Sequence, residues 1–250
     1  MFDVGGLVVV PFGPRDAAAN MDLDRRLLDA CERDPSRAYL RFYTWAPPAL
    51  SLGRFEPDDA VSAERARACG VDVVRRPTGG RVVLHSEDLT YSVVAPRSAG
   101  ATVADTYAWI SARIVEGLRR LGADVETARG SAERSVERRR PCFLSAARHE
   151  IVHQGRKLVG SAQRLEPNAL LQHGSLPIGR GYLRVVDYLA ADEAAKRRLA
   201  AEMVSGTVCL EEILGRRPAE AEVAAALEGA FVEGFGAPVE RSPARGDFPL

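Results

Sequence analysis

Cysteine is scarce in this sequence, and its four copies, Cys31, Cys69, Cys142 and Cys209, lie far apart. No two of them form a CxxC pair, the spacing that is typical of zinc knuckles and redox motifs. The spacing therefore excludes a disulfide framework, and we expect reduced thiols. The four histidines likewise show no HxxxH or HExxH pairing on a helix, because His149 and His153 lie in a predicted strand, so we expect no metal site.

Net charge and long apolar runs are also missing. The 34 basic residues balance 34 acidic ones, so the chain has no overall positive field for nucleic acid or an anionic membrane. No stretch approaches the roughly 18 consecutive apolar residues of a membrane helix, and no basic segment precedes the short apolar run at residues 7–10. We therefore expect a cytoplasmic protein that binds neither nucleic acid nor membrane.

The 250 residues are 46% hydrophobic and 27% charged, as in ordinary globular domains. Apolar residues at helical spacing predict helices over residues 17–33, 57–69, 102–121, 192–204 and 218–235. Short β-prone runs predict strands over residues 7–10, 38–46, 50–55, 71–74, 81–84, 89–94, 149–153, 157–163 and 169–173.

Connections between these elements are predicted from turn residues. Residues 11–16 and 131–140 are expected to be a turn and a solvated loop, strands 38–46 and 50–55 to pair, and residues 81–94 to form a β-hairpin. Strands clustered between helices favour an α+β fold, a central mixed β-sheet flanked by helices. We expect a single domain over residues 1–250, with its core at about 18–240.

The most unusual segment is RRPTGGRVVLHSED, residues 75–88. Gly79 and Gly80 carry no β-carbon, so their backbone can approach a ligand and offer N–H groups to a carbonyl or phosphate oxygen. A simple tight turn is the alternative, because neither GxxxxGK[ST] nor GxGxxG is present. His85 alone is more often a capping or core residue than a catalyst.

Cys142 follows a cluster of arginines at residues 134–140. Positive neighbours lower the pKa of a thiol and raise the thiolate fraction that nucleophilic chemistry needs. An inert packing residue is the alternative for any single cysteine, and we keep that interpretation for Cys31, Cys69 and Cys209.

Lysine is rarer still, because only Lys157 and Lys196 of the 34 basic residues are lysines. In such an arginine-rich chain, a lysine is expected where arginine cannot replace it. A lysine beside a thiol can accept or stabilise its proton, which a guanidinium cannot do. The alternative is an exposed surface charge.

Four segments in order resemble the octanoyltransferases of the LipM type, within the biotin/lipoate protein ligase superfamily. They are residues 75–94, PCF around Cys142, GRKLVGSAQR at 155–164 and LQHGSL at 171–176. The segment at 18–28 is similar to the opening helix of that family, and the resemblance covers approximately residues 18–180.

This resemblance implies the α+β catalytic-domain fold of the lipoate and biotin ligases. It also implies transfer of an octanoyl group from octanoyl-acyl carrier protein to a lysine of a lipoyl domain, such as glycine-cleavage H protein, as the first step of protein lipoylation. We expect a monomer that needs no cofactor.

The resemblance further assigns roles to individual residues. Cys142 is implied to be the acyl-thioester nucleophile, and Lys157 to lower its pKa. The residues implied to contact substrate are Arg76, Gly79, Gly80, Arg81, His85, Gly160, Ser161 and Ala162. One departure concerns His85, since the family often has an acidic residue directly after it, whereas here Ser86 intervenes before Glu87 and Asp88.

Three other functions remain open. Lipoate-protein ligases share the paired arginines, the glycines, the histidine and the lysine, but they use ATP and magnesium, need no cysteine, and usually carry a third glycine in place of Arg81. The octanoyl-H-protein amidotransferase uses a cysteine, but its loop is usually not RRPTGG. A lipoyl-domain binder without turnover would have an unreactive Cys142. Arg81 and Cys142 together favour the transferase.

Overall fold

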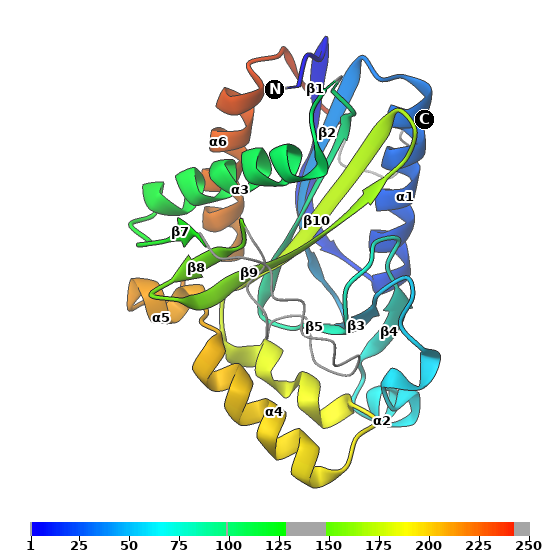
Figure 1. Cartoon of the computed structure of the whole chain (residues 1–250), viewed down its shortest axis with the longest axis vertical. Coiled ribbons are helices and arrows are strands. Elements are labelled where there is room, and N and C mark those ends of the chain that lie inside the picture. Colours follow the sequence, from blue (N-terminus) through cyan, green and yellow to red (C-terminus); the bar gives the residue numbers. More distant parts are fainter. Residues whose placement is uncertain (1, 99, 129–148, 243–250) are drawn as a thin grey trace.

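A computed structural model describes residues 2–98, 100–128 and 149–242 (Figure 1). The predicted loop at 131–140 and Cys142 lie outside the described residues. The large sheet has the strand order β11 (Val239–Arg241), β1 (Gly6–Arg15), β2 (Arg37–Trp45), β6 (Asp88–Pro96), β10 (Ala169–Pro177), β9 (Arg156–Leu165), β8 (Ile151–His153) and β7 (Glu126–Thr127). A smaller sheet has the order β4 (Asp72–Arg75), β3 (Ala49–Leu52) and β5 (Val83–His85).

The large sheet is mixed. Strand β1 runs parallel to its neighbours β2 and β11, whereas the other neighbouring strands are antiparallel. The helices are α1 (Ala17–Arg33), α2 (Ala63–Ala68), α3 (Val103–Arg120), α4 (Glu193–Gly206), α5 (Leu210–Leu214) and α6 (Glu220–Phe235), with 3₁₀ segments η1 (Asp58–Ala60) and η3 (Arg180–Tyr188). The predicted α+β fold with a central mixed sheet is confirmed.

Local signals explain where the two long amphipathic helices begin. The carboxylate of Asp16 accepts a hydrogen bond from the Ala19 amide at 2.7 Å, which caps α1 at the start that periodicity predicts. Thr102 and Asp105 form a reciprocal capping box at the start of α3. None of the helices in the described ranges is long and apolar enough to span a bilayer.

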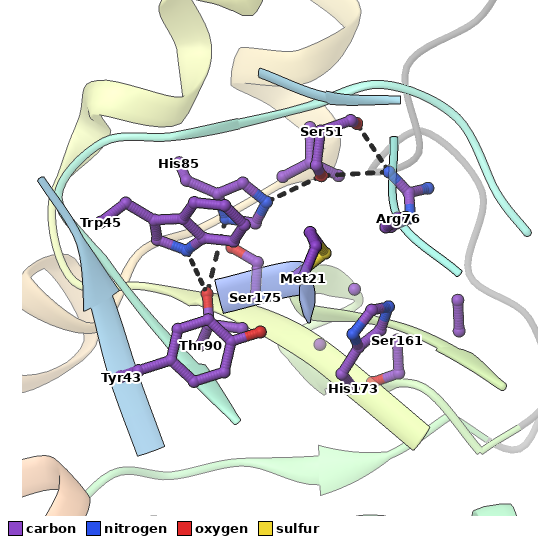
Figure 2. A pocket seen from close by; sticks show the side chains of 14 residues that line it. Met21, Tyr43, Trp45, Ser51, Arg76, His85, Thr90, Ser161, His173 and Ser175 are labelled. Atoms are coloured by element: carbon purple, nitrogen blue, oxygen red, sulfur yellow. Dashed lines mark hydrogen bonds between the residues drawn. The ribbon is translucent and has the colours of Figure 1, made fainter. Parts of the chain in front are cut away.

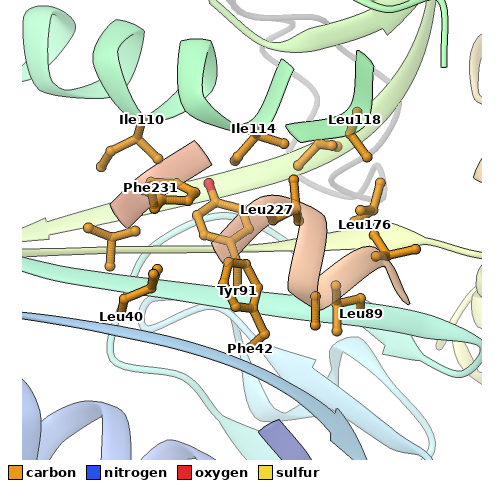
Figure 3. Close-up of a cluster of buried hydrophobic side chains, with 14 of the residues drawn as sticks. Leu40, Phe42, Leu89, Tyr91, Ile110, Ile114, Leu118, Leu176, Leu227 and Phe231 are labelled. Atoms are coloured by element: carbon orange, nitrogen blue, oxygen red, sulfur yellow. The ribbon is translucent and has the colours of Figure 1, made fainter. Parts of the chain in front are cut away.

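Strand alternation gives the large sheet two buried faces, and helices cover both (Figure 1). One face packs its apolar side chains against α3 and α6, as in the cluster of Leu40, Phe42, Tyr91, Ile114 and Phe231 (Figure 3). The opposite face packs against α1 through a second cluster, which includes Val8, Leu27, Tyr39, Val94 and Leu171. Buried polar side chains interrupt this α1 face, and those interruptions build the site described below.

The small sheet is also two-sided. Leu50, Leu52 and Leu84 pack against η3 and α4. Ser51 lies opposite Val83 in the β3–β5 register, and Ala49 lies opposite His85. Because these positions alternate with the apolar ones, Ser51 and His85 face away from the η3 and α4 core.

Three predicted connections are wrong. Residues 11–16 do not form a turn, since β1 continues to Arg15 with a register shift between Val10 and Gly13. Residues 81–94 do not form a hairpin, and strands β2 and β3 do not pair. In both cases the chain passes from one sheet to the other: β6 is flanked by β2 and β10, whereas β5 pairs with β3.

Candidate active site

A pocket lies between the α1 face of the large sheet and the inner face of the small sheet (Figure 2). Its walls come from α1, β2, β3, β5, β6, β9 and β10 and from the segment after β4. The lining residues are Met21, Tyr43, Trp45, Ser51, Arg76, Val83, His85, Thr90, Gly160, Ser161, Ala162, His173, Gly174 and Ser175. A mostly apolar cavity with a few convergent polar groups is typical of a small-ligand site.

Arg76 shapes the loop that connects β4 to β5. Its buried guanidinium donates to the carbonyl oxygens of Ser51 at 2.7 Å, of Gly79 at 2.9 Å and of Arg81 at 2.6 Å. The loop also packs against Gly53, where a β-carbon would lie 1.8 Å from the Gly80 carbonyl oxygen. Gly80 itself has a φ of 89°, a left-handed conformation that favours glycine. The two predicted glycines therefore belong to a tightly built loop.

Strands β9 and β10 form the opposite wall. Gly160 and Ser161 pair with Ser175 and Gly174 in the antiparallel register. A β-carbon on Gly174 would lie 2.7 Å from the Gly160 carbonyl oxygen, so only glycine fits there. The hydroxyl of Tyr91 donates to Ser161 Oγ at 2.6 Å, and burial raises the pKa of Tyr91 to about 12. Tyr91 therefore stays a neutral donor.

His85 is buried in a chain of hydrogen bonds. Its Nδ1 lies 2.9 Å from Asp88 Oδ2, and its Nε2 lies 2.8 Å from Ser51 Oγ. The indole ring of Trp45 stacks on the imidazole with a centroid separation of 4.1 Å. Asp88 thus supplies the acidic partner, although Ser86 directly follows His85.

A second buried histidine lies on β10. His173 Nδ1 is 2.8 Å from Asp24 Oδ2, and its Nε2 is 2.6 Å from the Thr78 hydroxyl. Burial lowers the pKa of His173, although Asp24 opposes this effect. Burial alone would raise the pKa of Asp24, but the guanidinium of Arg41 at 2.9 Å and the bond from His173 hold it below its ordinary value. The pair is therefore a neutral imidazole donating to a carboxylate.

Lys157 lies on β9, three residues before Gly160, and does not belong to the lining set. Its Nζ is 2.6 Å from Glu150 Oε1, and the two side chains are 3% and 7% exposed. The predicted alternative of an exposed surface charge is therefore wrong. Such burial of a lysine is rare without a paired charge.

The remaining predicted residues divide into two groups. Arg76, His85, Gly160, Ser161 and Ala162 line the pocket. Gly79, Gly80 and Arg81 belong to the adjoining loop rather than to the lining set. Of the three described cysteines, Cys31 and Cys209 are buried and Cys69 is exposed. Burial raises the pKa of Cys31 to about 12, which fits an inert thiol.

Several lining residues were not predicted from the sequence, among them Tyr43, Trp45, Ser51 and Thr90. A usable signal existed for the first two, because strict alternation along β2 puts Tyr43 and Trp45 on one face. Nothing local indicated that this face would meet β3, since the two strands lie in different sheets.

Residues 16–232 match the family described as Lipoyl protein ligase A/B catalytic domain. A protein of Exiguobacterium sp. named Octanoyltransferase LipM is 35% identical over 227 residues, which cover 87% of this chain and 82% of that protein. A protein of the same name from Moorella thermoacetica is 38% identical over 215 residues, with 82% and 77% covered. A solved bi-partite lipoate protein ligase from Thermoplasma acidophilum has a TM-score of 0.75 at 20% identity, with 96% and 87% covered, and shares the fold.

Proposed function

We propose a reaction for this chain from the premise that it belongs to the Lipoyl protein ligase A/B catalytic domain family. Its relatives bear out the resemblance to the octanoyltransferases, and the chain is a transferase enzyme. It transfers octanoyl groups in protein lipoylation. We further propose that the donor is octanoyl-acyl carrier protein and that the acceptor is a lysine of a lipoyl domain, such as glycine-cleavage H protein.

The proposed route has two steps and a covalent intermediate. The Cys142 thiolate attacks the octanoyl carbonyl carbon, the carbon–sulfur bond to the carrier breaks, and the carrier leaves as its thiolate. The neutral amine of the acceptor lysine then attacks the Cys142 thioester, an amide forms, the Cys142 thiolate is released, and the amine proton passes to the carrier thiolate. Exchange between two thioesters is nearly isoenergetic, so positioning dominates the first step, and aminolysis is downhill.

The observation that carries this proposal is the buried Lys157 on the strand that enters the pocket wall. An ammonium shielded from water acts more strongly on a nearby anion than an exposed one, so it would favour the thiolate form of Cys142. Its ion pair with Glu150 keeps the ammonium in one position. Strand β9 then leads directly to Gly160, Ser161 and Ala162.

In this proposal, the pocket holds the octanoyl chain. Met21, Tyr43, Trp45 and Val83 give it an apolar wall, which an acyl chain would cover. The loop held by Arg76 lies at the adjoining edge and would contact the carrier's arm. The buried imidazoles of His85 and His173 also line the cavity (Figure 2).

A transfer assay tests the proposal. The purified chain is incubated with octanoyl-acyl carrier protein and an apo lipoyl domain in the absence of ATP, and the mass of the lipoyl domain is followed. We expect an octanoyl addition that the Cys142→Ala variant does not catalyse. Modification that requires ATP and free octanoate or lipoate would instead assign a ligase and contradict the thioester route.

A further inference from the structure

Ser51 and His85 line the pocket (Figure 2), and with the buried Asp88 they form a continuous hydrogen-bonded relay of serine, histidine and aspartate. Ser51 Oγ lies 2.8 Å from His85 Nε2, and His85 Nδ1 lies 2.9 Å from Asp88 Oδ2. The three residues are 1%, 5% and 4% exposed, and they come from β3, β5 and β6. The transfer reaction proposed above does not use this hydroxyl as a nucleophile.

Neighbouring groups fix the direction of each hydrogen bond. Asp88 Oδ2 also accepts from the Ser175 hydroxyl at 2.6 Å and from the Thr90 hydroxyl at 3.3 Å. Thr90 is able to donate, because its own oxygen accepts from Trp45 Nε1 at 2.8 Å. An oxygen that receives several donors is a carboxylate acceptor, so His85 carries its proton on Nδ1. His85 Nε2 is then the acceptor for the Ser51 hydroxyl.

This direction is the one that nucleophilic catalysis requires. A base that hydrogen-bonds a hydroxyl, and is itself oriented by a carboxylate, activates the oxygen for attack on a carbonyl carbon. One N–H of the Arg76 guanidinium donates to Ser51 Oγ at 3.2 Å.

We propose that Ser51, His85 and Asp88 form a second acyl-transfer centre that hydrolyses medium-chain acyl esters and thioesters. The choice of an acyl substrate rests on the proposed function of the pocket, whereas the relay itself does not. This centre releases the acyl chain as a free acid when no acceptor amine arrives.

The steps balance with water as the co-reactant. Ser51 Oγ bonds to the acyl carbon while its proton moves to His85 Nε2. The bond from the acyl carbon to the leaving sulfur or oxygen breaks, and the leaving group takes that proton. Water then attacks the Ser51 ester and gives its proton to His85. The bond between Ser51 Oγ and the acyl carbon then breaks, His85 Nε2 returns the proton to Ser51 Oγ, and the free acid departs.

The test is covalent labelling of the full chain with an octyl fluorophosphonate, read by intact mass and peptide mapping. Hydrolysis of p-nitrophenyl octanoate is measured alongside. We expect one phosphonyl adduct on the peptide that contains Ser51, and a loss of hydrolysis of roughly 100-fold or more in Ser51→Ala and His85→Ala. Ser205→Ala, an exposed serine on α4, is the matched control and should be labelled as in the wild type.

Thermal unfolding checks that each variant is folded, and Ser51→Cys gives an independent result. A folded Ser51→Cys protein should retain a hydroxylamine-sensitive octanoyl group on its new thiol after p-nitrophenyl octanoate. Absence of any adduct in the wild type, labelling that Ser51→Ala leaves unchanged, or a folded Ser51→Cys protein that is not acylated there would each overturn the proposal.

The labelling is repeated in Cys142→Ala, because neither probe needs the transfer reaction. An adduct on Ser51 in a chain that fails to modify a lipoyl domain would support the relay and contradict the proposed transfer. Octanoyl transfer to a lipoyl domain without an adduct on Ser51 would support the proposed transfer and contradict the relay.

Discussion

Lys157 Nζ lies 2.6 Å from Glu150 Oε1, and more than nine-tenths of each side chain is buried. The two residues flank the β8–β9 turn, so a short local hairpin holds the ion pair together. A buried charge that is closely paired has little room for a larger side chain. A substitution of Lys157 therefore changes one defined buried contact, so it tests the role of this ammonium specifically.

Lys157→Arg should reduce octanoyl transfer at least ~100-fold although the positive charge remains. The planar guanidinium is larger than the ammonium and cannot place its charge in this buried position against Glu150 as the ammonium does. The measurement is kcat for transfer to a lipoyl domain. The Lys196→Arg variant is the matched control, because Lys196 pairs with the exposed Glu193 on α4. This variant should transfer octanoyl groups at the wild-type rate. Near-normal turnover by Lys157→Arg would mean that Lys157 is only a generic cation.

Gly53→Ala should displace the loop at residues 76–81. Its β-carbon would lie 1.8 Å from the Gly80 carbonyl oxygen, and backbone cannot yield as a flexible side chain does. We expect a loss of about 1–3 kcal/mol in unfolding free energy from overpacking, together with a raised KM for the acyl donor. Gly13→Ala is the control, because a β-carbon added at Gly13 would meet no atom within 4 Å. Equal KM values in the two variants would contradict a role of the loop in donor binding.

Trp45→Ala should widen the pocket and shift acyl-chain preference towards longer chains. Trp45 stacks on His85 and lines the cavity, so its removal leaves empty space at that wall. Truncation of a buried tryptophan also costs about 3–5 kcal/mol of stability. The ratio of kcat/KM for dodecanoyl and octanoyl donors is the measurement. Trp109→Ala is the control, since Trp109 packs on Phe235 at the opposite face and should leave this ratio unchanged.

Stability should fall as the pH drops from about 7 to 5. The pKa of His173 in the folded state is lowered from 6.5 by burial, so the unfolded chain binds a proton more readily there. The contribution of this histidine is at most about 1.4 kcal/mol per pH unit. Asp24 affects stability only at lower pH. Its pKa in the folded state lies below the ordinary 3.8, so the stability that its carboxylate contributes is lost only as pH falls through this lowered pKa.

Urea unfolding of the wild type and His173→Gln across this pH range measures the effect. The variant removes the titrating imidazole, so its free energy of unfolding should depend less steeply on pH. An identical slope in both proteins would show that other groups carry the acid sensitivity.

Sequence patterns predicted the elements of this fold better than their pairing. The helix over residues 17–33 begins and ends where periodicity and the Asp16 cap indicate. The prediction of a hairpin at 81–94 is wrong, because its two strands pair with strands elsewhere in the chain. Strand β5 pairs with β3, and strand β6 pairs with β2 and β10. Alternation is a local property, whereas strand pairing depends on the whole chain.

The same limit applies to the site. The glycine loop, His85 and the Gly160–Ala162 segment stand out as motifs, and the pocket brings His85 and that segment together. Alternation along β2 places Trp45 on one face of its strand, but neither Trp45 nor Ser51 shows locally that the two sheets close on each other around a pocket. The Asp88 partner of His85 was likewise hidden, because the motif suggested an acid at the position of Ser86.

A cysteine acyl-thioester intermediate would be detected by intact mass of the chain after incubation with octanoyl-acyl carrier protein without ATP. We expect a single octanoyl adduct that hydroxylamine removes and that Cys142→Ala does not form. No adduct on the wild-type chain, with ATP-dependent modification of a lipoyl domain by free octanoate, would contradict it and make Cys142 incidental.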